Sequence, residues 1–121
     1  MARVTMFHFS ASEPEVLARF YVEVFGWEFK RTKATNPTWQ VVCGSQDEPG
    51  IDGMLHTRER DSRVVNTIEV TDVESMLESI VSKGGRVIDR RTIPLAGEIA
   101  LFEDPEGNVF QVRQPPRGEA E

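Results

Sequence analysis

The sequence of 121 residues is long enough for one compact domain with a hydrophobic core and too short for two of ordinary size. Hydrophobic residues make up 39% of it and charged residues 28%, which is typical of a globular chain and excludes extensive disorder. The formal net charge of −6 argues against general nucleic-acid binding, because phosphate backbones require clustered Lys and Arg.

Membrane and secretory segments are not expected either. No apolar run approaches the roughly 20 residues that cross a bilayer, and the N-terminal residues lack the apolar region of a signal peptide. We therefore expect a cytoplasmic protein with no nucleic-acid and no membrane partner. The single cysteine, Cys43, lies in the apolar run 39–43, which indicates a buried, inert thiol rather than a nucleophile.

The first half of the chain reads as a strand, a helix and three short strands. Residues 4–10 alternate, which places Phe7 and Phe9 on one face of a strand. The opposite face then carries Met6, His8 and Ser10. A capping box at 12–15, with Ser12 as the cap, predicts a helix that Gly26 ends. The apolar residues expected to be buried by this helix are Val16, Leu17, Phe20, Tyr21, Val24 and Phe25. Strands are expected near 27–31, 39–43 and 51–56.

The second half repeats this order. Residues 65–71 alternate, so Ile68 and Val70 suit the face under a helix. The other face then carries Val65, Thr67 and Glu69. A second capping box is expected at 71–74. The helix after it is expected to bury Val73, Met76, Leu77, Ile80 and Val81. Strands are expected near 86–91, 98–103 and 108–113. We therefore divide one domain, residues 1–121, into module one (3–57), a linker (58–63), module two (64–113) and a tail (114–121).

Three sequence pieces carry a family resemblance: residues 18–27 (ARFYVEVFGW), 70–73 (VTDV) and 102–110 (FEDPEGNVF). In this order and spacing they resemble the vicinal oxygen chelate superfamily, which contains glyoxalase I, extradiol dioxygenases, methylmalonyl-CoA epimerase and bleomycin-resistance proteins. The resemblance covers nearly the whole chain. It implies an α+β fold in which two βαβββ modules form a curved mixed sheet around a central cleft.

In the enzymes of this superfamily the cleft holds a divalent metal, so the resemblance also implies ligand positions. By spacing from the matched pieces, these positions hold Met6, Val65, Gln111 and one of residues 53–55. Met and Val are poor ligands for a hard divalent cation. A shift of two residues would bring in His8 without rescuing the position of Val65. We therefore expect neither the usual divalent metal nor another cofactor, with a displaced metal site as the alternative.

Two ionisable residues are candidates for catalysis. His8 lies on the expected cleft face as a general base or ligand-binding group, or it is a hydrogen-bonded structural histidine. Glu69 pairs with His8 or Arg113, binds a polar ligand, or is a strand carboxylate satisfied by water. If both face the cleft, His8 and Glu69 make an acid–base couple. A metal site from His8, His56 and Glu69 is the less favoured alternative to an exposed His56.

The remaining candidates are ligand-binding residues: Met6, Ser10, Trp39, Thr67, Gln111 and Arg113. Gln111 is alternatively a hydrogen-bonding residue of the cleft wall. Trp39 could supply an aromatic wall for the ligand, whereas Trp27 suits the core.

Two functions remain open. The first is a glyoxalase-like, bleomycin-resistance-like protein that binds a small organic molecule between its modules without the usual metal. The second is a lyase, isomerase or dioxygenase that uses a displaced metal or proton transfer by His8 and Glu69. A homodimer is expected for either, because the resemblance includes small members that complete their clefts across a two-fold axis.

Overall fold

The computed structural model describes residues 2–58 and 64–116. Within them the chain divides into two compact units. The N-terminal unit contains residues 6–58 and 64–65, and the C-terminal unit contains residues 66–116 and 2–5. Most of the predicted linker (59–63) and of the predicted tail (117–121) lies outside the described residues. That the units make up one domain stays a prediction.

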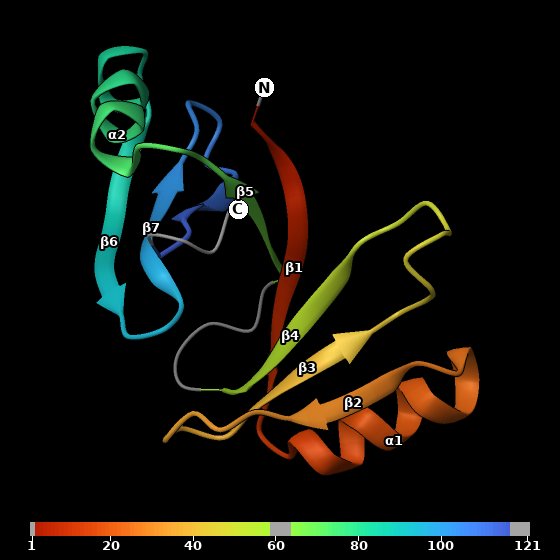
Figure 1. Ribbon diagram of the computed structural model, residues 1–121. Coiled ribbons are helices and arrows are strands. Elements are labelled where there is room, and N and C mark those ends of the chain that lie inside the picture. Colours follow the sequence, from red (N-terminus) through yellow and green to blue (C-terminus); the bar gives the residue numbers. More distant parts are fainter. Residues whose placement is uncertain (1, 59–63, 117–121) are drawn as a thin grey trace. The chain divides into compact units, whose positions relative to one another are not determined.

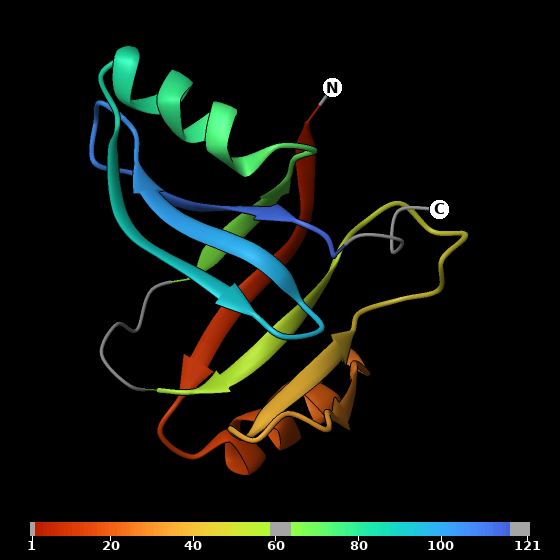
Figure 2. The same cartoon turned by 60° about the vertical axis from the view of Figure 1, so that its left-hand side comes forward.

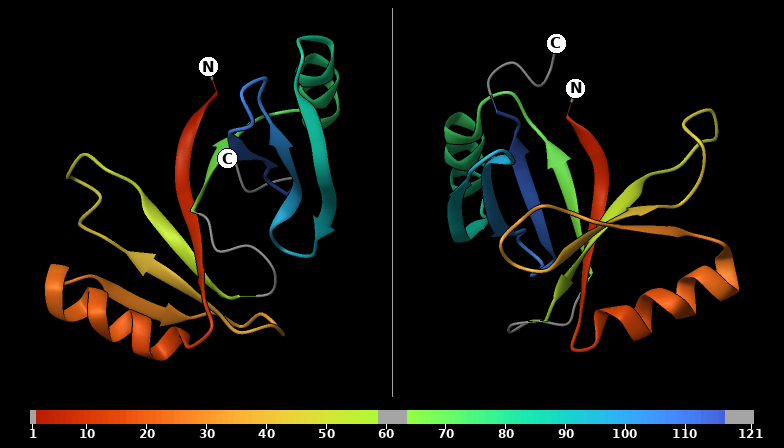
Figure 3. Two further views of the ribbon diagram at one scale, coloured as in Figure 1. Left: turned by 180° about the vertical axis from the view of Figure 1, so that it is seen from behind. Right: turned by 60° about the horizontal axis from the view of Figure 1, so that its bottom comes forward.

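The N-terminal unit has the order strand, helix and three strands. Its elements are β1 (Arg3–Ala11), of which residues 6–11 belong to this unit, α1 (Pro14–Phe25), β2 (Glu28–Arg31), β3 (Thr38–Val42) and β4 (Asp52–Thr57). The strands lie in the order β2-β3-β4-β1. β1 and β4 are parallel, whereas β3 is antiparallel to both β2 and β4. Figure 3 shows α1 beside β2.

The C-terminal unit repeats this arrangement. Its elements are β5 (Val65–Glu69), α2 (Val73–Ser82), β6 (Arg86–Ile93), β7 (Gly97–Glu103) and β8 (Val109–Gln114). The strands lie in the order β5-β8-β7-β6, with β5 and β8 parallel. β6 and β7 form a long antiparallel hairpin (Figure 2). The two units are therefore copies of one βαβββ module, which confirms the predicted α+β fold.

β8 ends at Gln114, one residue beyond the predicted strand and at the first residue of the predicted tail. The side-chain Oε1 of Gln114 accepts a hydrogen bond of 2.8 Å from the backbone N–H of Val73 in the first turn of α2. This bond satisfies an amide that has no partner within the helix. It therefore links the end of β8 to the start of α2.

The start of α1 also differs from the prediction. The N-cap is Glu13 rather than Ser12, and no side chain caps this helix. Pro14 opens the helix, and a residue before proline is driven out of the helical conformation, so the cap must lie at position 13. In α2 the N-cap is Asp72, whose carboxylate accepts from the N–H of Ser75. The cap therefore lies one residue after Thr71, which is the cap position of the box predicted at 71–74.

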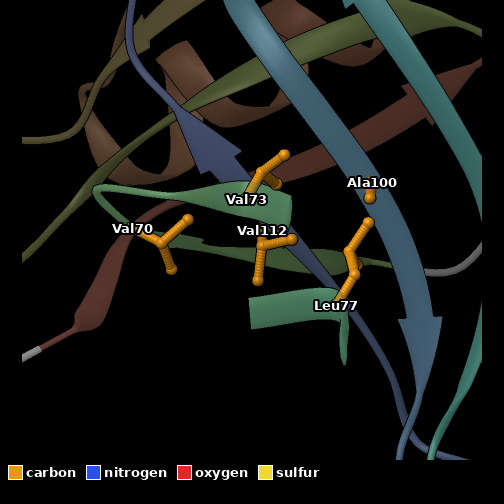
Figure 4. Close-up of a cluster of buried hydrophobic side chains, with 5 residues drawn as sticks. All are labelled: Val70, Val73, Leu77, Ala100 and Val112. Atoms are coloured by element: carbon orange, nitrogen blue, oxygen red, sulfur yellow. The ribbon is translucent and has the colours of Figure 1, made fainter. Parts of the chain in front are cut away.

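The core of the C-terminal unit lies between α2 and its sheet. Figure 4 shows the buried cluster, which consists of Val70, Val73, Leu77, Ala100 and Val112. Partly buried Ile68 lies against it, as the alternation predicted. Figure 1 shows α2 beside β6. Val81, which was predicted to be buried, is 56% exposed, because it lies in the last turn of α2 beyond Leu77.

The core of the N-terminal unit consists of Ala11, Val41 and Leu55, with Phe7, Phe9 and Leu17 packed against it. A Cβ at Gly53 would lie 2.6 Å from the ring of Phe7, so only glycine fits under this ring. The predicted burial of the α1 stripe is largely wrong, since no residue of α1 is fully buried. The exposed members of the stripe are Val16, Phe20, Val24 and Phe25. The stripe is wider than the surface that the sheet offers one helix.

Candidate functional site

The face of the N-terminal sheet opposite the hydrophobic core carries the polar candidates of β1. The register of the parallel strands pairs Met6 with Asp52, His8 with Met54 and Ser10 with His56. These side chains alternate with Phe7 and Phe9, which belong to the core. The placement of Met6, His8 and Ser10 on the opposite face from Phe7 and Phe9 therefore agrees with the prediction from alternation. We call this surface the open face of the N-terminal unit.

The two histidines of the chain contact each other on this open face. His8 Nδ1 lies 2.9 Å from His56 Nε2, and the rings are nearly parallel, with an interplanar angle of 8°. Both residues are half-buried. The interpretation of His56 as an exposed residue at a strand end is therefore wrong. The sequence did not predict this contact, because the parallel pairing of β1 with β4 depends on both strands and cannot be read from either one alone.

In the C-terminal unit, the face of the sheet opposite its hydrophobic core, which we call the open face of that unit, carries a buried polar pair. Thr67 and Gln111 are directly opposite in the register of β5 and β8. The side-chain amide Nε2 of Gln111 donates a hydrogen bond of 3.0 Å to Thr67 Oγ1. Thr67 is fully buried and Gln111 is 9% exposed. Burial of these polar groups is inexpensive because they are hydrogen-bonded, which agrees with the interpretation of Gln111 as a wall residue.

Glu69 and Arg113 form the next pair on the same face of these two strands, two residues beyond Thr67 and Gln111. Arg113 Nη1 lies 3.1 Å from Glu69 Oε1, and Arg113 Nε donates a 2.7 Å hydrogen bond to the carbonyl oxygen of Ala96. Of the two partners considered for Glu69, the structure shows Arg113. Because His8 and Glu69 belong to different units, their proposed acid–base couple stays a prediction.

Trp39 lies on the other side of the N-terminal sheet. Its register partner is Leu55, and both belong to the core that α1 covers. The guanidinium of Arg31 lies 5.3 Å from the centre of its ring. Trp39 also lines a cavity of about 440 Å³ beside the start of α1, together with Pro37 and Thr57. If Trp39 binds a ligand, that site is separate from the face of His8. Trp27 packs against the same core, as expected.

The donor set does not fit the divalent metal that the resemblance implies. Met6 offers a thioether and Val65 offers no ligand atom, so two of the implied positions lack a suitable donor. The carboxylate of Glu69 is engaged by Arg113. Among residues 2–58 and 64–116, no cluster of three His, Cys, Asp or Glu side chains could hold a metal ion.

Asp52 contacts Cys43, a contact that the sequence did not predict. Its Oδ1 accepts a 2.8 Å hydrogen bond from the backbone N–H of Cys43, and its charge lies close to the thiol. Burial first, and then the negative charge of Asp52, raise the pKa of Cys43 above its ordinary value. A raised pKa lowers the thiolate fraction at neutral pH, which supports the prediction of an inert thiol.

In the part of the chain that the structure describes, no helix is long and apolar enough to cross a membrane.

Comparison with known sequences gives one family. A family model described as a glyoxalase-like domain matches residues 6–113, which span both units. No curated protein matches the sequence. The match confirms the relationship that the three sequence pieces predicted.

Several solved structures share the fold. A hypothetical protein from Bacillus halodurans C-125 has a TM-score of 0.72 at 10% identity, over 96% of each chain. A methylmalonyl-CoA epimerase variant from Streptomyces coelicolor, in complex with 2-nitronate-propionyl-CoA, has a TM-score of 0.71 at 17% identity, over 95% of this chain and 98% of that one. The Mycobacterium tuberculosis methylmalonyl-CoA epimerase has a TM-score of 0.67 at 14% identity, over 97% and 90%. At these identities the likeness shows the fold alone.

Proposed function

Because the chain belongs to the glyoxalase-like domain family, we propose that it binds a small organic molecule without the divalent metal of the enzymes that it resembles. The observation that carries this proposal is the chemistry of the open faces. They present a histidine pair in the N-terminal unit and the Glu69–Arg113 ion pair in the C-terminal unit, where the neighbouring Thr67–Gln111 pair is buried. Hydrogen-bonding and charged groups of this kind orient a polar organic ligand. A bleomycin-resistance-like protein that binds its ligand without reacting with it needs only such orienting groups.

The class of ligand is suggested by the similar structures. Methylmalonyl-CoA epimerases with this fold hold methylmalonyl-CoA or 2-nitronate-propionyl-CoA. The low identity means that a coenzyme A thioester is a probe to be tested first rather than an assigned ligand. The ligand-binding residues proposed for this chain are Met6, Ser10, Thr67, Gln111 and Arg113, with Trp39 at its separate cavity.

A second candidate function is an isomerase, lyase or dioxygenase that moves a proton. The observation in its favour is that two titratable side chains, His8 and Glu69, lie on open faces and remain half-buried. Proton transfer by a positioned side chain requires groups of these types. A displaced metal site remains the other route to such an activity.

Metal analysis and ligand binding separate these functions. Protein purified without chelator is analysed for bound nickel, zinc, iron and manganese, and the metal-free proposal predicts far less than one metal per chain. Thermal shift is then measured with methylmalonyl-CoA and a library of small organic acids. Binding should raise the melting temperature of the wild type. His8→Ala and Glu69→Ala should weaken that rise, whereas Glu23→Ala on the exposed side of α1 should not. A stoichiometric metal would overturn the metal-free proposal, and equal rises in all variants would remove both residues from the site.

We also propose that the chain forms a homodimer and resides in the cytoplasm. The dimer is supported by large apolar side chains that remain exposed on α1, among them Phe20 at 52%. The location is supported by the single cysteine, since secreted proteins of this size commonly carry disulfides.

A further inference from the structure

Arg31 and Trp39 face each other as register partners on the antiparallel strands β2 and β3. The guanidinium of Arg31 lies 5.3 Å from the centre of the Trp39 ring, which is the separation of a cation–π contact. Arg31 Nη1 also donates a 2.9 Å hydrogen bond to the carbonyl oxygen of Thr32. In the part of the chain that the structure describes, no carboxylate forms an ion pair with this guanidinium. The indole ring therefore holds in place a cation that no fixed anion neutralises.

Both side chains line the cavity of about 440 Å³ beside the start of α1. Cavities of roughly 300–1,000 Å³ are the usual size of small-molecule sites. Besides the indole ring, the apolar part of its lining includes Pro14 and Pro37. All of the lining residues belong to the N-terminal unit, on the side of the sheet that faces its core rather than on the side of His8. The cavity is therefore a site distinct from the open faces.

Two carboxylates belong to the lining of the same cavity. Glu13 is the N-cap of α1, and Glu15 lies in the first turn of this helix. Within the described residues, neither side chain makes a hydrogen bond or an ion pair, and no side chain caps the helix. The helix dipole favours acidic residues at this end of a helix, but it does not account for a guanidinium at the same cavity without a carboxylate partner. The cavity thus presents charges of both signs that do not neutralise each other.

We propose that this cavity binds a small zwitterion, a molecule that carries a carboxylate and an ammonium group on one apolar frame. Arg31 donates to the carboxylate, because a planar guanidinium matches the two carboxylate oxygens. Glu13 and Glu15 accept from the ammonium group, and the apolar frame lies against Trp39 and the two prolines. A molecule with one of these charges alone leaves the other charged end of the cavity without a partner, so the zwitterion binds best. The proposal does not depend on the ligand proposed for the open faces.

Nuclear magnetic resonance of the indole N–H groups tests the site in the full chain. The chain has two tryptophans, and Trp27 does not line the cavity, so its signal is an internal control; Trp39→Phe assigns the two signals. Titration with L-leucine or 6-aminohexanoate, which differ in the spacing of their charges, should shift the Trp39 signal and leave the Trp27 signal in place.

Single-charge analogues show whether both charges of the ligand are recognised. Hexanoate keeps the carboxylate and hexylamine keeps the ammonium group on a frame like that of 6-aminohexanoate. Each should bind at least about tenfold more weakly than the tighter of the two zwitterions, because one charge-assisted hydrogen bond is missing. An unshifted Trp39 signal with both zwitterions, or equal affinity for a zwitterion and one of these analogues, would overturn the proposal.

Variants of the exposed charged residues separate the two ends of the ligand. Arg31→Gln should weaken binding of the tighter zwitterion about tenfold and leave that of hexylamine unchanged, since only the partner of the carboxylate is lost. The double variant Glu13→Gln and Glu15→Gln should weaken the same zwitterion and leave hexanoate unchanged. The matched control is Lys30→Gln, which removes one positive charge from the opposite face of β2 and should leave every affinity unchanged. Equal affinity of the zwitterion for the wild type, Arg31→Gln and the double variant would exclude the site.

Discussion

Glu69 and Arg113 face each other directly across the parallel strands β5 and β8, with 3.1 Å between Oε1 and Nη1. The same guanidinium holds the carbonyl oxygen of Ala96, the residue that follows the exposed Leu95 in the β6–β7 turn. The side chain of Arg113 is 17% exposed and that of Glu69 is 35% exposed. Water therefore replaces only part of the interaction when either partner is removed. The pair therefore connects the end of β5 to the turn of the hairpin.

Removing Arg113 should be more harmful than neutralising Glu69. Arg113→Ala leaves a half-buried carboxylate and a backbone carbonyl without their donor, and we expect the free energy of unfolding to fall by about 2 kcal/mol. Glu69→Gln keeps an acceptor oxygen for Arg113, so the expected loss is under about 1 kcal/mol. Urea denaturation of the two single variants and the double variant gives the coupling energy. Equal losses in both single variants would contradict this account.

The caps of the two helices allow a paired comparison. Asp72→Ala removes the acceptor of the Ser75 N–H at the start of α2, and we expect a loss of about 1 kcal/mol in the free energy of unfolding. Ser12→Ala should cost under about 0.5 kcal/mol, because α1 has no side-chain cap. Thermal unfolding measures both variants. If Ser12→Ala proved as costly as Asp72→Ala, the N-cap of α1 at Glu13 would have to be revised.

The sequence predicted what depends on local pattern. Alternation placed His8 opposite Phe7 and Phe9, and Thr67 and Glu69 opposite Ile68, because the two-residue period of a strand fixes these faces. It could not predict the His8–His56 contact or the position of Trp39. Both depend on which strands pair and in which register, and that is decided by residues far apart in the chain.

The exposure of α1 was mispredicted for a related reason. Helical spacing identifies an apolar stripe, but how much of it is covered depends on the partner surface. The burial of the corresponding apolar stripe on α2 was predicted better, since Val73 and Leu77 are buried. Family spacing placed Gln111 at a metal-ligand position, with a hydrogen-bonding wall residue as the alternative, and the structure shows its side chain bonded to Thr67.

Cys43 should react slowly and with a shifted pH dependence. Burial, and secondarily the charge of Asp52, raise the pKa of its thiol, so the folded protein favours the neutral form. This contribution to stability is complete below the pKa of the unfolded thiol and is lost as pH rises through the higher folded value. We expect a thiol-reactive disulfide reagent to modify the folded chain more slowly at pH 7.5 than the urea-unfolded chain. Asp52→Asn should recover only part of the difference, because burial is the larger cause. Equal rates in the folded and unfolded chains would contradict the shift.

The proposed homodimer makes a prediction about α1. Val16, Phe20 and Val24 follow one another at helical spacing along one side of the helix and are 60%, 52% and 56% exposed. Burial of one such side chain on association contributes roughly 1.5–3 kcal/mol, whereas an unpaired carboxylate at the same place opposes association.

Sedimentation velocity of Phe20→Asp tests this interface. The wild type should sediment as a dimer and the variant as a folded monomer, because Phe20 lies outside the core. The matched control is Leu95→Asp, which places the same charge on a residue that is 95% exposed in the turn of the C-terminal unit. It should remain a dimer. A monomeric wild type would refute the homodimer itself, and dissociation of the Leu95 variant alone would move the interface from α1 to the β6–β7 turn.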